Sequence, residues 1–326
     1  MNLRRSTKHL VDPDLLPLLE RYATYPLNAE VLPGQREEIA ASAPADDGAG
    51  DGLPIRVERV SVTRNFGDGT VPVVLILPAM PSTPRGAILH IHGGGYVKGS
   101  PNQGLARLRR QVHALDCIIA SVDYALAPEF PFPTAIEDCY ASLCWLYEHA
   151  EAYAIDRERI GVAGESAGGG LAAALALMAR DRKGPRLAFQ NLLYPMLDDR
   201  TGRPGRTENP FAGEFVWPRD SNDFGWNCLL GLARGSDTVS PYAAPARADS
   251  LIDLPQAYIA VGALDLLVDE DVEYAMRLCR AGVPVELVVY QGAVHGFNLA
   301  SGVAIADRAT EDRMKALARG LKKPQR

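Results

Sequence analysis

The segment from Ile160 to Gly170 (IGVAGESAGGG) constrains the fold of this chain more than any other stretch. A short apolar run ends in Gly164-Glu165-Ser166-Ala167-Gly168, and an alanine-rich run from Leu171 to Arg180 follows. This order predicts a strand, a tight turn and a helix, with the glycine spacing of a nucleophile elbow around Ser166. The glycines let strand and helix pack closely, and the hydroxyl lies at a helix N-terminus, where N–H groups stabilise an anion. Glycine-rich turns also match this pattern by chance, so the rest of the chain decides between the two interpretations.

The composition is that of a globular protein and narrows the possible partners. Hydrophobic residues make up 47% of the 326 residues and the formal net charge is −6, which argues against a nucleic-acid-binding surface. The apolar run from Leu171 to Ala179 is far shorter than the roughly 20 residues of a membrane span. The basic N-terminus is not followed by an apolar signal region, so we expect a cytoplasmic protein without a membrane span.

Sequence motifs for metals and cofactors are missing. The five cysteines form no C-x-x-C pair, and no Walker sequence, H-E-x-x-H motif or calcium loop occurs. His90 and His92 are close enough in sequence to share a metal ion, but no third ligand is evident. We therefore expect neither a disulfide framework nor a metal or other cofactor.

Apolar strand patterns alternate with helical patterns from residue 87 onwards. Two earlier strands, 56–63 and 71–77, flank the turn Asn65–Gly69 and are expected to form an antiparallel pair. The alternation predicts a mostly parallel sheet, eight-stranded in all, with helices on both faces and the ligand site at the carboxyl ends of the strands. The later strands are expected at Ala87–Ile91, Cys117–Val122, Ile160–Ala163, Leu187–Leu193, Ala257–Val261 and Val285–Tyr290, and the helices at about 103–115, 134–150, 166–182 and 268–281.

Two segments fall outside this alternation. In residues 1–53 we expect a helical arm, with a helix capped at Asp12-Pro13-Asp14 and a flexible, breaker-rich linker over 40–54. Residues 198–235 are too long for a strand–helix connection and contain an amphipathic piece around Trp226. We expect this insertion to pack with the arm as a small helical cap over the strand ends of a catalytic domain spanning 54–326.

A serine nucleophile needs a base, and His295 is the best candidate among the six histidines. It lies in a glycine-flanked loop directly after the last strong strand, where catalytic residues tend to lie. His92 opens a glycine loop, where a hydrogen-bonding role is expected. The other four lie in the basic tail, in a strand or in helical patterns: His9, His90, His113 and His149.

The base needs an orienting carboxylate, and Asp265 follows a strand at the right place in the chain. The resulting order of serine, acid and histidine is that of one known class of Ser-His-Asp enzymes. Asp269 and Glu270 are rivals, but they lie where a helix begins, and capping and the helix dipole explain carboxylates there.

Three consecutive glycines, Gly93 to Gly95, follow the strand that ends near His92. Without side chains, their backbone N–H groups can turn towards a bound anion. In acyl transfer such groups hold the oxyanion of the tetrahedral intermediate. The alternative is an ordinary glycine-rich turn.

Taken together, these motifs resemble the hormone-sensitive-lipase-like group of α/β-hydrolases, the bacterial family IV carboxylesterases. The resemblance covers roughly residues 87–298 and implies the α/β-hydrolase fold with a small helical cap. Two residues depart from the usual pattern of this family: Glu165, where an aspartate is commoner, and Ala125, where an arginine often stands. The matching motifs are His92–Gly95, Asp123–Glu129, Gly164–Gly169, Leu193–Pro195, Asp265–Glu270 and His295–Phe297.

The resemblance also implies the roles of the site residues. Ser166 is the nucleophile, His295 the general base and acid, and Asp265 the orienting acid. The N–H groups of Gly94, Gly95 and Ala167 form the oxyanion hole, and His92 and Gly93 shape its loop.

We therefore expect a serine carboxylesterase that hydrolyses short- to medium-chain acyl esters of small molecules through an acyl-enzyme. The same triad could act on amide, lactone or carbamate bonds. A receptor of the gibberellin-binding type is a further alternative, but those proteins lack the triad histidine. A homodimer through the sheet edge Val285–Tyr290 is expected. Five aromatic residues of the insertion line an apolar pocket or form the core of the cap: Phe211, Phe215, Trp217, Phe224 and Trp226.

Overall fold

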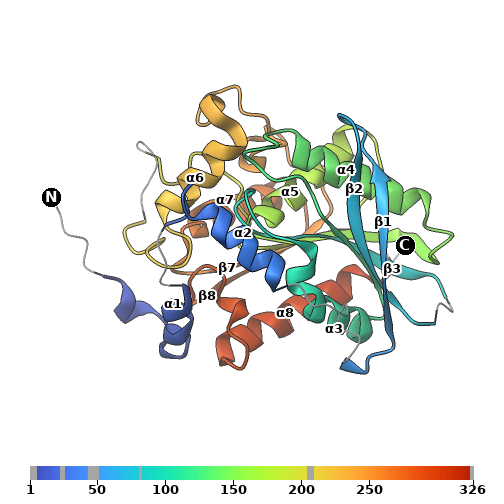
Figure 1. The fold of residues 1–326 in the computed structure, drawn as a ribbon, viewed down its shortest axis with the longest axis horizontal. Helices are drawn as coiled ribbons and strands as arrows, with labels where there is room; N and C mark the ends of the chain where they lie inside the picture. Colours follow the sequence, from blue (N-terminus) through green and yellow to red (C-terminus); the bar gives the residue numbers. More distant parts are fainter. Residues whose placement is uncertain (1–5, 23–25, 43–50, 81–82, 204–208, 324–326) are drawn as a thin grey trace.

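An eight-stranded sheet runs through the centre of the molecule (Figure 1). The computed structural model describes the chain except for residues 1–5, 23–25, 43–50, 81–82, 204–208 and 324–326. The strand order is β1-β2-β4-β3-β5-β6-β7-β8; β2 is antiparallel to both neighbours and the later strands are parallel, which confirms the predicted sheet. The strands are β1 Ile55–Thr63, β2 Thr70–Pro78, β3 Arg85–Ile91, β4 Ile118–Val122, β5 Ile155–Glu165, β6 Phe189–Leu193, β7 Gln256–Gly262 and β8 Val285–Tyr290.

Helices cover both faces of the sheet (Figure 1). On one face lie α3 (Leu105–Leu115) and α8 (Ala304–Gly320); on the other lie α4 (Thr134–Glu148), α5 (Ala167–Asp181) and α7 (Val268–Arg280). Four of these helices match the predicted ranges within a few residues, whereas α8 was not predicted. Short 3-10 turns are η4 Pro101–Gly104, η6 Pro245–Arg247 and η7 Phe297–Leu299.

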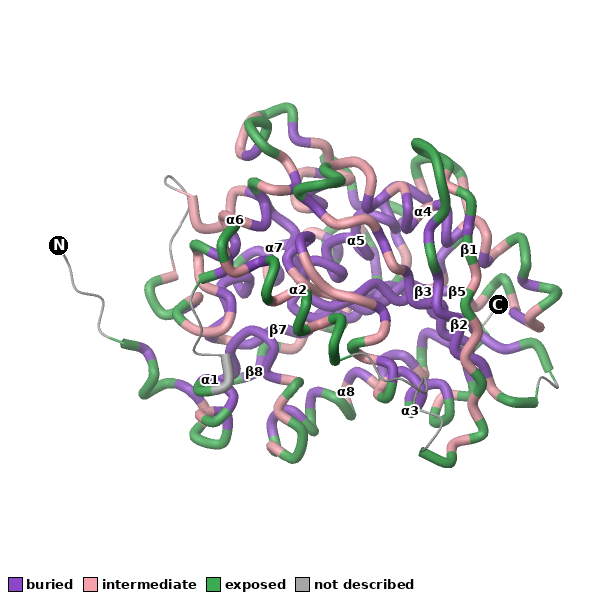
Figure 2. Tube along the Cα trace, in the orientation of Figure 1, coloured by how far each residue is buried: buried purple, intermediate pink, exposed green. Residues whose placement is uncertain are grey.

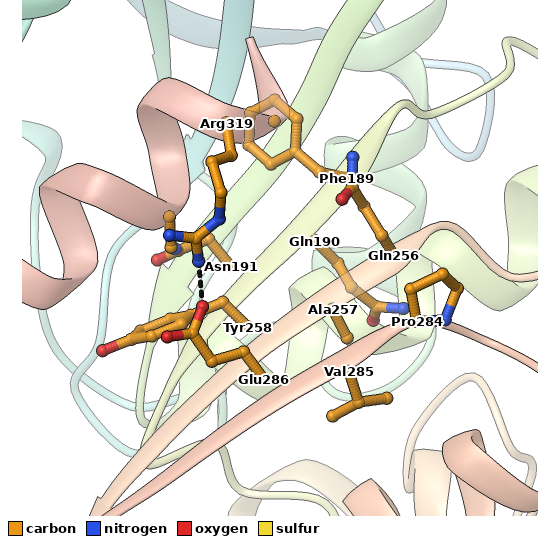
Figure 3. Close-up of a pocket in the computed structure, with 12 residues that line it drawn as sticks. Phe189, Gln190, Asn191, Gln256, Ala257, Tyr258, Pro284, Val285, Glu286 and Arg319 are labelled. Atoms are coloured by element: carbon orange, nitrogen blue, oxygen red, sulfur yellow. Dashed lines mark hydrogen bonds and ion pairs between the residues drawn. The ribbon is translucent and has the colours of Figure 1, made fainter. Parts of the chain in front are cut away.

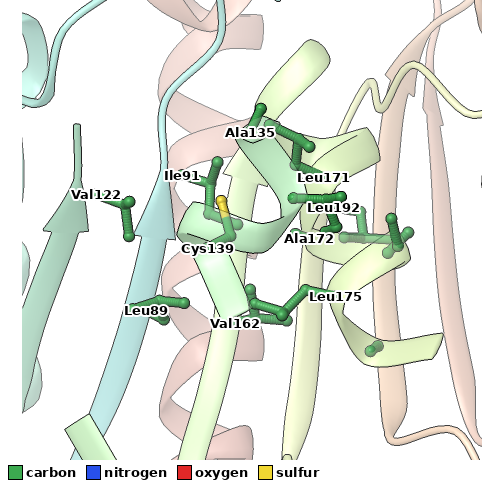
Figure 4. Packing of buried hydrophobic residues seen from close by; sticks show 14 of the residues in the cluster. Leu89, Ile91, Val122, Ala135, Cys139, Val162, Leu171, Ala172, Leu175 and Leu192 are labelled. Atoms are coloured by element: carbon green, nitrogen blue, oxygen red, sulfur yellow. The ribbon is translucent and has the colours of Figure 1, made fainter. Parts of the chain in front are cut away.

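The central strands are apolar on both faces because helices cover both. Leu89 packs with Leu175 of α5 and its neighbours (Figure 4), whereas Ile88, the residue before it, packs with Leu108 of α3 and Leu317 of α8. Burial on both faces removes the alternation of an exposed strand and gives the continuous apolar runs that the sequence shows. Figure 2 shows the buried residues concentrated along these strands.

The N-terminal arm contains η1 (Lys8–Leu10), η2 (Pro13–Leu15), α1 (Leu16–Tyr22) and α2 (Leu32–Ala41). The predicted helical start at Asp12 is that of η2, where the Asp12 side chain accepts a hydrogen bond from the Asp14 N–H; η1 was not predicted. α2 was not predicted, since it is mostly exposed and its sequence has no clear apolar stripe. Of the predicted linker 40–54, residues 43–50 lie outside the described residues.

The insertion contains α6 (Arg219–Leu230), the predicted amphipathic piece, and η5 (Gly231–Ala233). It contacts the arm at two places: the Leu27 N–H donates to Ser221 Oγ at 2.8 Å, and Glu214 accepts 2.6 Å hydrogen bonds from Thr7 N and Oγ1. The arm and the insertion therefore lie against each other. In the described part of the chain, no helix is both long and apolar enough to span a membrane.

Candidate active site

Ser166 lies at the turn between β5 and α5, with φ 56° and ψ −121°. This backbone conformation is rare for a residue with a side chain and marks a sharp turn. The glycines on either side are sterically required: a Cβ at Gly168 would overlap the carbonyl oxygens of Ile91 and His92, and one at Gly164 would overlap the Gly168 carbonyl. The predicted strand, turn and helix are therefore present, and the serine hydroxyl lies at the carboxyl end of the sheet.

Ser166, His295 and Asp265 form a hydrogen-bonded line. His295 Nε2 lies 3.0 Å from Ser166 Oγ, and His295 Nδ1 lies 2.8 Å from Asp265 Oδ2. The other oxygen of Asp265 accepts a hydrogen bond from the Leu267 N–H at 3.0 Å, which fixes the carboxylate. The three residues are 6%, 7% and 1% exposed, respectively. A neutral imidazole that donates from Nδ1 leaves Nε2 to accept the serine proton, as a general base must.

The two rival carboxylates lie elsewhere. Among the described residues, His295 bonds to Asp265 and to neither rival. Asp269 is exposed and lies 3.5 Å from Asn209 Nδ2. The explanation of Glu270 by helix capping was wrong: it is buried and its Oε1 accepts the Leu197 N–H at 2.6 Å. Glu270 thus holds the loop after β6 rather than the start of its own helix.

The loop from Gly93 to Gly95 lies directly against the elbow. A Cβ at Gly93 would lie 2.9 Å from the Glu165 carbonyl oxygen. Gly94 and Gly95 have φ values of 126° and 63°, which favour glycine. Within the described part of the chain, the N–H groups of Gly94, Gly95 and Ala167 donate to no protein acceptor. Three predicted oxyanion donors are thus available beside Ser166.

His92 and His90 have different surroundings and do not face a common ligand. His92 Nδ1 lies 2.9 Å from the Gly93 carbonyl oxygen, and its ring stacks on Tyr124 with centroids 4.3 Å apart. Burial lowers the pKa of His92 to about 4, so the neutral ring donates to the loop, as expected for a hydrogen-bonding role. The described residues include no group of three histidine, cysteine or acidic side chains that could hold a metal ion.

A buried ionic cluster below the nucleophile was missed by the sequence analysis. Glu165 Oε1 lies 2.5 Å from Arg313 Nη1 and 3.1 Å from Arg107 Nη1, and Oε2 lies 3.1 Å from His90 Nε2. Burial disfavours the charged carboxylate, but the charges of Arg107 and Arg313 and the hydrogen bond with His90 outweigh it and hold the pKa of Glu165 well below its usual value. The sequence showed only the unusual glutamate of the elbow, because its partners lie far away in the chain.

The aromatic residues of the insertion differ in their surroundings. Trp217 packs on Gly95, where a Cβ would overlap its ring, and its centroid lies 5.9 Å from that of His295. Its Nε1 donates to Asn222 Oδ1 at 3.2 Å, which fixes the ring. Trp226 is fully buried against Tyr96 and belongs to the same hydrophobic cluster as the central strands and α5. Phe215 and Phe224 are half-buried, and Phe211 is 55% exposed.

A separate cavity of about 200 Å³ lies at the other end of the sheet (Figure 3). Its walls include the first residues of β6, β7 and β8, among them Phe189, Gln256 and Val285, and the ion-paired Arg319 and Glu286. Ser166 follows the carboxyl end of β5, and the cavity lies at the amino ends of the neighbouring parallel strands. The cavity is therefore not part of the serine–histidine site.

The chain is similar to known esterases in sequence and structure. A family model described as alpha/beta hydrolase fold matches residues 88–299. Esterase LipI of Mycobacterium tuberculosis is 41% identical over 71% of this chain and 71% of its own length, and carboxylesterase NlhH of the same species is 37% identical over 82% and 83%. Among solved structures, a bacterial heroin esterase superimposes with a TM-score of 0.88 at 35% identity, over 97% of this chain and all of its own.

Proposed function

Because the chain belongs to the α/β-hydrolase family, in its hormone-sensitive-lipase-like group, and is a carboxylic-ester hydrolase, we propose that Ser166, His295 and Asp265 are its catalytic triad. The observation that carries this proposal is the hydrogen-bonded line from Ser166 Oγ through His295 to Asp265. The N–H groups of Gly94, Gly95 and Ala167 next to the serine support it, because an oxyanion needs such donors.

The geometry leads to a two-step hydrolysis. Ser166 Oγ attacks the ester carbonyl carbon while His295 Nε2 takes the hydroxyl proton, and the carbonyl oxygen becomes an oxyanion held by the three N–H groups. The intermediate collapses, the C–O bond to the alcohol breaks, and His295 gives its proton to the leaving alkoxide. Water then attacks the acyl-enzyme with His295 as base, and the acid is released as Ser166 regains its proton.

The proposed substrates are small esters with short to medium acyl chains. Trp217 lies between Gly95 and His295, beside the position that the reacting carbonyl must take, and therefore limits the space for the substrate. Residues 1–53 and 198–235 form the proposed cap of the catalytic domain 54–326. The contacts of Thr7 and Leu27 with the insertion, and of Gly225 in α6 with the Gly95 carbonyl, support this assignment.

Initial rates on p-nitrophenyl esters from acetate to palmitate test the proposal, with Ser166→Ala as the control. We expect a maximum at short chains that disappears in Ser166→Ala. Trp217→Ala should move the maximum to longer chains if the indole sets the limit. Unchanged hydrolysis in Ser166→Ala would refute the assigned triad. A folded wild type that hydrolyses no ester but hydrolyses amides, lactones or carbamates would refute the ester substrate.

A homodimer through the sheet edge stays a prediction. β8 is the last strand in the sheet order, and Val289 on it is exposed. A strand edge of this kind can pair with another chain. A monomeric mass by light scattering at micromolar concentration would contradict the dimer.

A further inference from the structure

The cluster around Glu165 carries an excess of positive charge. Arg107 and Arg313 are cations and Glu165 is an anion, because its pKa is held well below the usual value. His90 adds no charge: burial lowers its pKa, and its Nδ1 lies 2.9 Å from Ser121 Oγ. Two cations and one anion leave one net positive charge, and the side chains of Arg313 and Glu165 are only 5% and 11% exposed. The side chain of Arg107 is 30% exposed, so water screens this charge only in part.

The cluster connects the strands that carry the site. Glu165 precedes Ser166 at the end of β5, and its carbonyl oxygen lies so close to Gly93 that a Cβ there would come within 2.9 Å of it. His90 lies in β3, two residues before His92. Arg313 Nε also donates to Asn191 Oδ1 of β6 at 2.8 Å, and β6 leads to Tyr194, whose ring centroid lies 4.5 Å from that of His295. One side chain from α8 thus links β5 and β6 below the serine.

We propose that Glu165, Arg107 and Arg313 are positioning residues for the ester hydrolysis proposed above, which fix the nucleophile elbow against the oxyanion loop and supply a net positive charge beneath Ser166. This charge acts on two parts of the reaction. It stabilises the developing oxyanion, and it opposes a second positive charge on the His295 ring during the reaction.

The direction in which the pH profile shifts distinguishes an effect of charge from an effect of structure. Glu165→Gln removes the anion and leaves both arginines, so the midpoint of the acidic limb of kcat/KM against pH should fall. Arg313→Gln removes a cation, so this midpoint should rise. We expect shifts of about half a pH unit in opposite directions. The midpoint does not depend on how much of a destabilised variant is folded.

Other titratable groups near His295 are the same in all variants. Asp265 contacts it directly, and Tyr194 packs on its ring. Asp271 of α7 is influenced by the charge of Asp265, and the Asp12 N–H of the arm donates to the Gly292 carbonyl in the histidine loop. Their contribution therefore cancels when the midpoints of the variants are compared with the wild type.

A matched charge removal and a conservative substitution complete the experiment. Arg319→Gln removes a cation from the same helix, where Arg319 pairs with Glu286 at the other end of the strands, and should not move the midpoint. Arg313→Lys keeps the charge but loses the paired contacts to Glu165 and Asn191. It should keep the midpoint and lower kcat roughly tenfold with little change in KM, because the elbow is displaced.

Two results would overturn the inference: midpoints of Glu165→Gln and Arg313→Gln that move in the same direction, or midpoints that stay at the wild-type value. Either result, obtained with an active wild type, leaves the proposed triad intact. A folded wild type without esterase activity, or an unaltered Ser166→Ala variant, contradicts the proposed function instead.

Discussion

Glu165 and Asp271 are both buried carboxyl groups near the triad, but their surroundings favour opposite charge states. Glu165 faces Arg107, Arg313 and His90, and its pKa is held well below the usual value. Asp271 lies on α7, and neither of its oxygens has a hydrogen-bond partner within the described part of the chain. Burial, together with the charges of Glu270 and Asp265, raises the pKa of Asp271 well above its usual value. Burial alone therefore does not set the charge; the partners do.

Because of this difference in partners, the two sides of the site differ in charge. On the α3 and α8 face, the Glu165 cluster is positive. On the α7 side, burial raises the pKa of Glu270 and the pKa of Asp271, which favours their neutral forms, whereas Asp265 is hydrogen-bonded to His295. The partners of each buried carboxyl group therefore decide which of its forms is favoured.

The largest expected difference is in kcat, between the variants Asp265→Asn and Asp271→Asn, which make the same substitution at the two positions. Asp265→Asn should lower kcat by about 10⁴, since the amide favours the wrong tautomer of His295. Asp271→Asn should leave kcat within about twofold, because it replaces a neutral group by one of similar size. Steady-state kinetics on a short-chain p-nitrophenyl ester measures both. A loss in Asp271→Asn comparable to that in Asp265→Asn would mean that Asp271 also acts on the histidine.

Glu165 and Asp271 should also differ in their effect on stability. Glu165→Gln leaves Arg313 buried without a carboxylate, so the free energy of unfolding should fall by about 3 kcal/mol, near the lower end for a broken buried ion pair because Arg107 is partly exposed. At about pH 4, where little of the linkage cost of the Asp271 carboxyl is present, Asp271→Asn should change it by less than about 1 kcal/mol. Urea denaturation followed by circular dichroism gives both values. Equal losses of unfolding free energy in the two variants would show that the ionic partners of Glu165 do not contribute to stability.

The sequence predicted the parts of the site that are local. Gly164, Ser166 and Gly168 lie within one turn, and the short distance in the chain makes their steric requirement visible as a pattern. His295 and Asp265 could be predicted because each follows a strand, and parallel strands end at the same edge of the sheet. The eight-stranded sheet followed from the same alternation of strands and helices.

The rest of the site depends on contacts that leave no local pattern. Arg313 lies 148 residues after Glu165 in the chain, on α8, a helix that the sequence analysis did not predict. Glu270 was assigned to helix capping because its position at the start of α7 explains an acid there; its real partners are in the loop after β6. Trp217 and Trp226 look alike in sequence, and only the packing of α6 decides which one faces His295.

The pH dependence of stability gives the finest test of the comparison, because the two carboxyl groups should act in different pH ranges. The pKa of Asp271 in the folded state lies above its ordinary value of 3.8. As pH rises from 3.8 towards the raised pKa, the carboxyl ionises in the unfolded chain but stays protonated in the folded state, so the folded state loses stability. Asp271→Asn removes this cost, and its stability relative to the wild type should increase as pH rises from about 4 towards 7.

Glu165 has the opposite sign. Its folded pKa lies below its ordinary value of 4.5, so its contribution is fully present above that value and is lost as pH falls through the folded pKa. The deficit of Glu165→Gln should therefore be constant from about pH 5 to 7 and shrink in acid. Urea denaturation of both variants and the wild type at half-unit steps of pH measures the two profiles. If the stability of Asp271→Asn relative to the wild type does not change between about pH 4 and 7, the Asp271 carboxyl does not titrate in this range. Glu165 and Asp271 would then differ in their contacts but not in their favoured charge state.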